Sequence, residues 1–271
     1  MPKEKVLITV KTYPSISEKY DELVCTAGFR ENGTWIRIYP IQFRKKAYHE
    51  QYAKYQWIEM DLVKNTSDFR KESYRPANNN TEIKIIGEIK PDRDNWKERR
   101  KIVLNKVYSN LKTLFAEAKN KEIGTSLAVF KPTQIHKLEI KEVDREWSRK
   151  KLEKMKQLNL FDSKKDGEFE VVRKLPYKFS YKLSDDEGTE STMMIEDWEI
   201  GQLYWNSLRR HNRDEQLACE DVRRKYIDDF AKTKDLYLFL GTTQRHHNTA
   251  PNPFVIIGTF HPKRTTRTSL F

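Results

Sequence analysis

Aromatic and basic side chains alternate in one early stretch of the chain, residues 35–57, which reads WIRIYPIQFRKKAYHEQYAKYQW. The stretch holds seven aromatic rings and five Lys or Arg side chains around a single acid, Glu50. Rings stack on nucleobases and cations neutralise phosphates, so this composition is typical of a nucleic-acid-binding surface. The side chains that we expect to make these contacts are Trp35, Arg37, Tyr39, Phe43, Arg44, Lys45 and Lys46.

The segment TWIRIYPI predicts a strand that carries the first of these side chains. Trp35, Arg37 and Tyr39 share one face of such a strand, while Ile36 and Ile38 share the other. The isoleucine face packs on a core, and the other face offers two rings and a cation. An alternative stays open, in which both rings cover a second hydrophobic layer and the stem of Arg37 passes them to reach solvent.

Further cations lie beside aromatic residues or predicted turns. The chain has 52 Lys and Arg against 40 Asp and Glu, a formal net charge of +12. In DFRKESYRP, Arg70 and Arg75 flank Phe69 and Tyr74. Near the C-terminus, basic side chains occur at the tip of a predicted hairpin and in the tail. From these segments we expect additional phosphate contacts by Arg70, Arg75, Arg245, Lys263 and Arg264.

Two carboxylates in IEDWEIG are the best candidates for catalysis. Asp197 and Glu199 could hold Mg²⁺ against phosphates in a nuclease. The alternative is that Asp197 caps a helix and Glu199 interacts favourably with the positive end of its dipole. The sequence contains no phosphate-binding P-loop, serine elbow, HExxH or CxxC motif, so it favours a non-enzymatic role and leaves catalysis open.

Metal and cofactor sites are not indicated by the sequence. Cys25 and Cys219 stand far apart with no ligand partner at metal-binding spacing. His246 and His247 are adjacent, so their side chains point apart on a helix or a strand. We expect no bound metal and no cofactor.

A short peptide in a polar stretch indicates a protein partner. Residues 157–161 read QLNLF, which resembles the pentapeptide that binds the bacterial sliding clamp. In this hypothesis Leu158, Leu160 and Phe161 enter an apolar groove of the clamp, while Gln157 makes polar contacts at its rim. The alternative is that these side chains anchor a helix end to the protein's own core.

The apolar segments are too short to cross a membrane or to form a secretory signal. A spanning helix requires roughly 20 apolar residues, whereas the mean hydropathy of this chain is −0.87. The N-terminal apolar stretch ends at Lys11 and lacks a small-residue cleavage site. We therefore expect a cytoplasmic protein with no membrane partner.

Periodicity divides the chain into β-rich and helical parts. Short β-branched or aromatic runs fill the first ninety residues, with a hairpin turn at Glu31, Asn32 and Gly33. A helical stripe predicts one long helix over residues 94–122. After a charged helix and linker at residues 144–168, we expect a hairpin, two helices capped by Asp197 and Asp214, and two final strands. The predicted domains are residues 1–143, 144–168 and 169–271.

The opening pattern resembles a known family. The LVCTAGF strand, the ENG turn and the WIRIYPI strand are similar to the start of dual OB-containing domain proteins, over residues 5–40. Ala27, Gly28, Trp35, Ile36 and Arg37 carry this resemblance. It implies a bacterial, nucleic-acid-associated module of immunity or mobile-element systems. We therefore expect an α+β protein of OB-like or related small β-barrel halves, with one long helix and a C-terminal helical pair.

These observations predict a basic accessory protein that binds nucleic acid, with DNA favoured over RNA, in anti-phage defence or DNA maintenance. Two alternatives remain. One is a metal-dependent nuclease or nucleic-acid-modifying enzyme with its acids around Asp197. The other is an interaction subunit recruited to a sliding clamp or to a defence complex.

Overall fold

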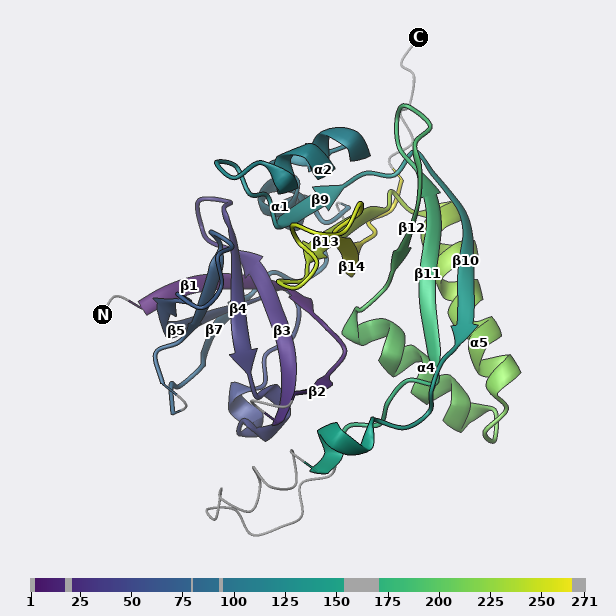
Figure 1. Ribbon diagram of the computed structural model, residues 1–271, viewed down its shortest axis with the longest axis horizontal. Coiled ribbons are helices and arrows are strands. Elements are labelled where there is room, and N and C mark those ends of the chain that lie inside the picture. The colour runs from purple at the N-terminus through teal and green to yellow at the C-terminus, as the bar shows by residue number, and fades with distance from the viewer. Residues whose placement is uncertain (1–2, 18–20, 79, 93–94, 154–170, 265–271) are drawn as a thin grey trace.

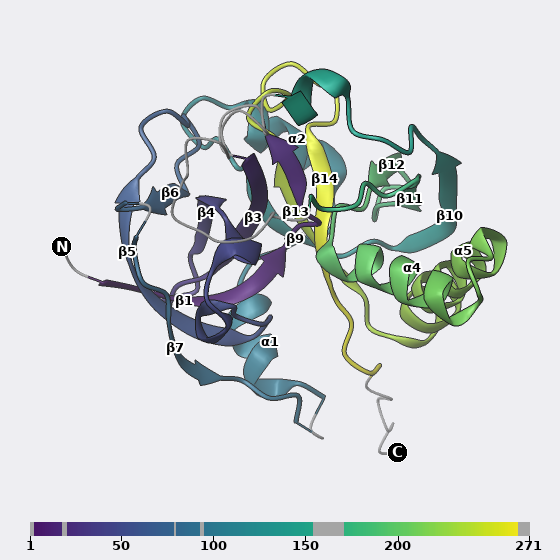
Figure 2. The same cartoon turned by 90° about the horizontal axis from the view of Figure 1, so that it is seen from below.

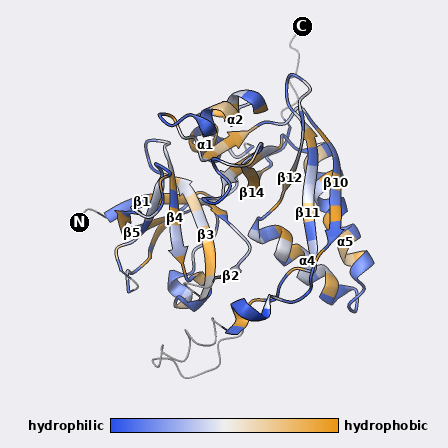
Figure 3. Ribbon diagram, viewed as in Figure 1, coloured by the Kyte–Doolittle hydropathy of each residue, from blue (hydrophilic) through white to orange (hydrophobic). Residues whose placement is uncertain are grey.

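The computed structural model describes residues 3–17, 21–78, 80–92, 95–153 and 171–264. The protein is α+β, with more strands than helices among these residues. A closed five-stranded barrel forms the N-terminal part, and two further sheets with a pair of helices form the C-terminal part (Figure 1). Apolar segments concentrate on the strands, while the connecting loops are largely hydrophilic (Figure 3).

The barrel consists of β1 (Lys3–Lys11), β3 (Asp21–Phe29), β4 (Trp35–Ile41), β5 (Gln56–Lys64) and β6 (Ser73–Pro76). Its strands follow the order β1-β3-β4-β6-β5, and pairing of β1 with β5 closes the ring. β4 and β6 run parallel, and the other neighbours are antiparallel. This OB-like barrel confirms the expected fold class, and it is the one closed ring among the described strands.

Alternation along the strands fills the interior of the barrel. Ile36 and Ile38 of β4 point inward against Ile58 and Met60 of β5, and all four are buried. Two 3-10 helices, η1 (Phe43–Lys45) and η2 (Tyr48–Glu50), connect β4 to β5. The short β2 (Ser15–Ser17) pairs with β3, and β7 (Lys84–Glu88) pairs with β5, so they extend the sheet beyond the ring.

The turn between β3 and β4 has the predicted hairpin geometry. Thr34 O accepts a hydrogen bond from Arg30 N at 2.9 Å, and Gly33 has a φ of +77°. A Cβ at Gly33 would also lie 2.8 Å from Asn105 Nδ2, so glycine suits this position for both its backbone and its neighbour. The hairpin therefore packs against Asn105, the residue that precedes Lys106.

The C-terminal part contains two sheets. β8 (Val107–Tyr108), β9 (Leu127–Phe130), β13 (Tyr237–Thr242) and β14 (Phe254–Phe260) form one, in the order β14-β13-β9-β8. β10 (Gln134–Glu142), β11 (Tyr177–Ser184) and β12 (Glu190–Met194) form the other. The predicted hairpin between β11 and β12 and the two final strands are confirmed. The division into domains at residues 144–168 stays a prediction.

The predicted helical pair is also confirmed. α4 (Trp198–Arg210) and α5 (Glu215–Arg223) begin after Asp197 and Asp214, and each of these carboxylates accepts a hydrogen bond from its own helix. α5 continues as a π-helix, η3 (Arg224–Ala231). Tyr204 and Tyr226 pack on Phe179 and Tyr181, so the helices cover one face of the three-stranded sheet (Figure 2). No helix in the described part of the chain is both long and apolar enough to span a bilayer.

The single long helix expected over residues 94–122 is wrong. The structure has two helices instead, α1 (Lys97–Val103) and α2 (Leu111–Lys119), with β8 between them. Val107 and Tyr108 pair with β9 in parallel, and Asn110 caps α2 by accepting a hydrogen bond from Thr113 N. Sheet pairing thus overrides the helical stripe. The predicted cap Asp94 lies outside the described residues.

The first sheet of the C-terminal part packs against the outside of the barrel. Phe29 and Ala27 of β3 lie in one buried cluster with Val129 of β9 and Phe239 of β13. Figure 1 shows β13 and β14 beside the upper end of β3. This contact decides which part of the barrel surface remains open.

Candidate functional site

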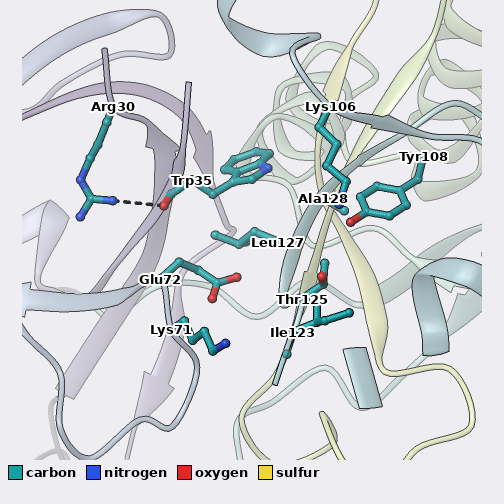
Figure 4. Close-up of a pocket in the computed structure, with 11 residues that line it drawn as sticks. Arg30, Trp35, Lys71, Glu72, Lys106, Tyr108, Ile123, Thr125, Leu127 and Ala128 are labelled. Atoms are coloured by element: carbon teal, nitrogen blue, oxygen red, sulfur yellow. Dashed lines mark hydrogen bonds between the residues drawn. The ribbon is translucent and has the colours of Figure 1, made fainter. Parts of the chain in front are cut away.

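A groove of about 350 Å³ lies where the barrel meets the C-terminal part. Figure 4 shows its two sides. Arg30, Trp35, Lys71 and Glu72 line it from the barrel, whereas Lys106, Tyr108, Ile123 and Thr125 line it from the opposite side, with Leu127 and Ala128 completing the lining. The groove therefore combines two rings, an apolar part and several charged side chains.

Trp35 is held firmly but is only half-buried. Its ring centroid lies 3.9 Å from that of Phe29 on the neighbouring strand, and its ring meets Phe239 edge-on at 5.8 Å. No described residue accepts a hydrogen bond from the indole N–H of Trp35. The groove thus presents a rigid ring and a donor that a ligand could use.

Cations outnumber acids around the groove. Arg30 Nε lies 2.9 Å from Glu4 Oε2, and its guanidinium stacks at 4.8 Å from the Tyr74 ring. Lys71 Nζ donates to the carbonyl of Glu122. The acid of the lining, Glu72, already accepts hydrogen bonds from Ser126 N and Oγ, at 3.2 and 2.7 Å. The side chains that line the groove therefore comprise three cations and one acid, Glu72, which already accepts hydrogen bonds within the protein.

Lys106 is an exposed cation of the groove, with 68% of its side chain accessible. Its Nζ lies 3.5 Å from Glu117 Oε2 and 4.6 Å from the centroid of the Tyr108 ring. Burial alone would raise the pKa of Glu117, but hydrogen bonds from Tyr108 and Thr125 and the charge of Lys106 lower it. Glu117 thus stays ionised and positions the lysine at the rim.

Arg37 is not on the surface, and our expectation that it faces a polyanion is wrong. It is 2% exposed. Its guanidinium donates to Ser126 Oγ at 2.8 Å, to Ser126 O at 3.0 Å and to Ser73 Oγ at 3.4 Å. The cause is the segment directly before β9, which contains Ser126 and covers this face of β4. Arg37 therefore neither contacts nucleic acid from the surface nor reaches solvent past the rings, as the two predictions had it.

Two more of the expected surface residues are buried. Arg70, 7% exposed, contacts both carboxylate oxygens of Asp68 and donates to the carbonyl of Thr242. Phe43, 5% exposed, packs against Tyr52 and Trp198 with ring centroids 4.8 and 5.7 Å away. The prediction that these two side chains lie on the surface is therefore wrong, because each one makes its contacts inside the protein.

The remaining predicted side chains do not form one patch. Arg75, Arg245, Lys263 and Arg264 are exposed, while Tyr39, Arg44, Lys45 and Lys46 are half-buried. Lys46 Nζ donates to Thr81 O at 2.8 Å, and Arg264 Nε donates to Lys234 O at 3.1 Å. From Trp35 to the end of β4 the chain advances about 20 Å at ~3.3 Å per residue. The basic segment after β4 thus lies far from the groove.

Sequence reasoning missed Arg30, Lys71, Lys106 and Tyr108. Arg30 directly precedes the predicted turn at Glu31, Asn32 and Gly33. Lys71 lies inside the segment DFRKESYRP, from which we expected contacts by Arg70 and Arg75 only. Lys106 and Tyr108 fell within the helix that we expected over residues 94–122. The run from Asn105 to Tyr108, with its poor helix formers, was the available signal for a break.

Asp197 and Glu199 meet a lysine that the sequence did not reveal. Lys54 Nζ lies 2.8 and 2.9 Å from the two Asp197 oxygens and 3.0 Å from Glu199 Oε2. Asp197 is fully buried. Burial raises its pKa to about 6, although the charge of Lys54 opposes this shift. Lys54 thus occupies the carboxylate oxygens that a metal would need, and the cluster joins the barrel to α4.

The other polar candidates are used within the fold. His247 Nδ1 lies 2.8 Å from Thr242 Oγ1, and the His261 ring stacks on Phe230 at 3.8 Å. Cys25 and Cys219 are free thiols whose pKa is raised by burial. Among the described residues, no three His, Cys, Asp or Glu side chains gather in a way that could hold a metal. Gln157, Leu158, Leu160 and Phe161 lie outside the described residues.

These features define a two-part α+β protein built on an OB-like barrel with a basic, aromatic groove beside it. The chain belongs to the family described as domain of unknown function DUF8757, whose model matches residues 107–271. A second model, domain of unknown function DUF8758, matches residues 2–105. None of the curated proteins matches this chain. The resemblance to dual OB-containing domain proteins stays a prediction.

One solved structure is similar over the full length. Its description reads "Structure of murine DNA binding protein bound with ds DNA", and the likeness covers 98% of each chain. The sequence identity is 10% and the TM-score is 0.33.

Proposed function

We propose that the protein binds nucleic acid through the groove between the barrel and the C-terminal part, as an accessory factor in anti-phage defence or DNA maintenance. One observation carries the proposal: the groove gathers Trp35, Lys71 and Lys106 around an open space of about 350 Å³ that is lined by three cations and one acid. Rings that stack on bases and cations that neutralise phosphates are the two components of such a surface. The formal net charge of +12 supports attraction to a polyanion.

The test is a binding titration across a salt series. Labelled single-stranded and duplex DNA and RNA are titrated with the protein, and the logarithm of the association constant is plotted against that of the salt concentration. We expect a negative slope, and a slope shallower by about 0.7–0.9 for each phosphate contact removed. Lys106→Ala and Lys71→Ala should each show this change.

A matched control removes the same charge elsewhere. Lys84 is exposed on β7 and does not line the groove. Lys84→Ala should therefore leave the slope as it is in the parent protein. If all three alanine variants give the parent slope, the groove is not the binding surface. If no nucleic acid binds at low salt, the proposed function is wrong.

Two other functions stay predictions. Recruitment to a sliding clamp would depend on the peptide from Gln157 to Phe161. A metal-dependent nuclease would depend on Asp197, whose oxygens are bound to Lys54 in this structure.

A further inference from the structure

The barrel surface on which OB folds bind single strands is covered by the protein itself. Such barrels bind through the face of their second and third strands and through flanking loops. These strands are β3 and β4 here, and Phe29 and Trp35 on them pack against Phe239 of the C-terminal sheet. Arg37 is bound to Ser126. An extended strand therefore cannot lie across this face.

One of the flanking loops is covered as well. Residues 65–72 connect β5 to β6, and Gln244 Nε2 donates to Ser67 O in this loop at 2.7 Å. Arg70 of the same loop donates to Thr242 O. The groove is thus the opening that remains next to β3 and β4, at the edge of the covered face.

The size of the groove fits one base better than several. At about 350 Å³ it is at the lower end of the range for ligand pockets. Leu127 and Ala128, both buried, contribute its apolar lining, and Trp35 and Tyr108 stand on opposite sides (Figure 4). A base inside a duplex is stacked and paired on its edges, so it enters such a space only when it is unpaired or extruded.

The polar groups of the groove match a base and its two flanking phosphates. The indole N–H of Trp35 is a donor without an acceptor among the described residues, and nucleobases carry carbonyl and ring-nitrogen acceptors. Lys106 stands on one side of the groove, and Lys71 and Arg30 stand on the other (Figure 4). Cations on both sides suit a chain that enters the groove and leaves it.

We propose that the groove holds a single unpaired nucleobase of a polynucleotide, with Trp35 as its ring contact and hydrogen-bond donor and with Lys71 and Lys106 on the adjoining phosphates. The inference rests on the proposed function and adds to it a preference for unpaired over paired strands. DNA and RNA offer the same bases and phosphates, so both are possible sources of this ligand.

The experiment compares four probes at one salt concentration. Fluorescence anisotropy follows binding of the full chain to four labelled probes. They are a single-stranded DNA, an RNA of the same sequence, the blunt DNA duplex, and the same duplex with one unpaired nucleotide at a 3′ end. We expect the single strands and the overhang duplex to bind at least tenfold more tightly than the blunt duplex. The two single strands show whether DNA or RNA is preferred.

Variants of Trp35 test the role of the ring. Trp35→Ala should weaken binding of the single strands about 5- to 150-fold, the range expected for loss of one stacked base. Trp35→Phe keeps a ring and loses the donor, so its loss should be smaller. Tyr48→Ala removes a ring that is 92% exposed in η2, away from the groove, and should leave binding unchanged.

A folding control keeps the result interpretable, because Trp35 also packs on Phe29 and Phe239. Lys106→Glu changes an exposed charge at the rim and leaves these packing contacts alone. It should weaken single-strand binding even if Trp35→Ala unfolds. Equal affinity for blunt duplex and single strands, or parent affinity in both Trp35→Phe and Lys106→Glu, would overturn the inference and leave the proposed function standing. Failure of all four probes to bind would reject the proposed function itself.

Discussion

The guanidinium of Arg37 lies 2.8 Å from Ser126 Oγ and 3.0 Å from Ser126 O, so a barrel arginine is bound by the residue that precedes β9. The two residues are 89 positions apart in the chain. Both are buried. An arginine that could have served a ligand instead fastens the C-terminal part to the barrel.

We predict that Arg37→Ala destabilises the protein without affecting the groove directly. Removing the side chain leaves Ser126 O without its charged donor and opens a cavity at the contact. The free energy of unfolding should fall by about 2–4 kcal/mol. Urea denaturation measures this change. Arg75→Ala, an exposed arginine of the same barrel, is the control and should shift the midpoint little.

A second prediction concerns the buried pair of Asp68 and Arg70. Burial alone would raise the pKa of Asp68, but hydrogen bonds from Arg70 and Ser73 lower it to about 2. A folded-state pKa below the ordinary value of about 3.9 means that this carboxylate stabilises the fold above that pH. The stabilisation is lost as the pH falls toward 2.

The measurement is the difference in unfolding free energy between the parent and Asp68→Asn. At pH 6 the variant should be about 3 kcal/mol less stable, because Arg70 is left buried without its partner charge. The difference should shrink by about 2 kcal/mol between pH 5 and pH 2.5, since Asp68 of the unfolded parent takes up a proton at about pH 3.9 while the folded protein resists protonation down to about pH 2. A difference that is constant with pH would contradict the assigned shift.

Local patterns predicted the elements well where neighbours in sequence are also neighbours in space. The hairpin at Gly33, the caps Asp197 and Asp214, and the alternation of Ile36 and Ile38 all depend on contacts within a few residues. Each was correct because turn geometry, capping and strand periodicity are local properties. The helix over residues 94–122 failed because Val107 and Tyr108 pair with a strand some twenty residues away.

The groove could be predicted only in part, for the same reason. Trp35 was recognised because its strand alternates, but its partners Lys71, Lys106 and Tyr108 reach it through tertiary contacts. The sequence pattern places Arg37 and Trp35 on the same face of β4. Nothing local in the sequence shows that Ser126 covers Arg37 while Trp35 stays only half-buried. Burial of that face depends on how the two parts dock.

A third prediction concerns the reactivity of Lys11. Burial lowers the pKa of its amine to about 8, an effect to which the nearby charge of Lys54 adds. A folded-state pKa below the ordinary lysine value means that folding favours the neutral amine. Stability should therefore rise with pH between about 8 and 10.5 from this group, because the unfolded chain holds the proton more tightly there.

Competitive acylation with peptide mass spectrometry tests this shift directly. The rate of modification at Lys11, plotted against pH, should have its midpoint near 8 rather than near the ordinary value of about 10.4. The Lys11 ammonium also lies 4.5 Å from the Phe43 ring and 5.1 Å from the Trp198 ring, and these rings favour the charged form. A midpoint above 10 would show that the rings outweigh burial.

The last prediction separates a structural role of Asp197 from a catalytic one. Lys54→Met leaves the buried Asp197 carboxylate without its partner and should cost about 3–5 kcal/mol of unfolding free energy. Adding Asp197→Asn removes the unpaired charge and keeps a side chain that can cap α4. The double variant should therefore recover part of that loss, and urea denaturation of the parent, the two single variants and the double variant measures it.

Nuclease assays on the same variants complete the comparison. If the cluster only joins the barrel to α4, Asp197→Asn changes stability and leaves any metal-dependent cleavage by the parent unaltered. If the carboxylate instead serves catalysis, cleavage of DNA in the presence of Mg²⁺ disappears in Asp197→Asn at temperatures where the variant is still folded. Full additivity of the two substitutions in unfolding free energy would contradict the ion pair, because residues in direct contact couple.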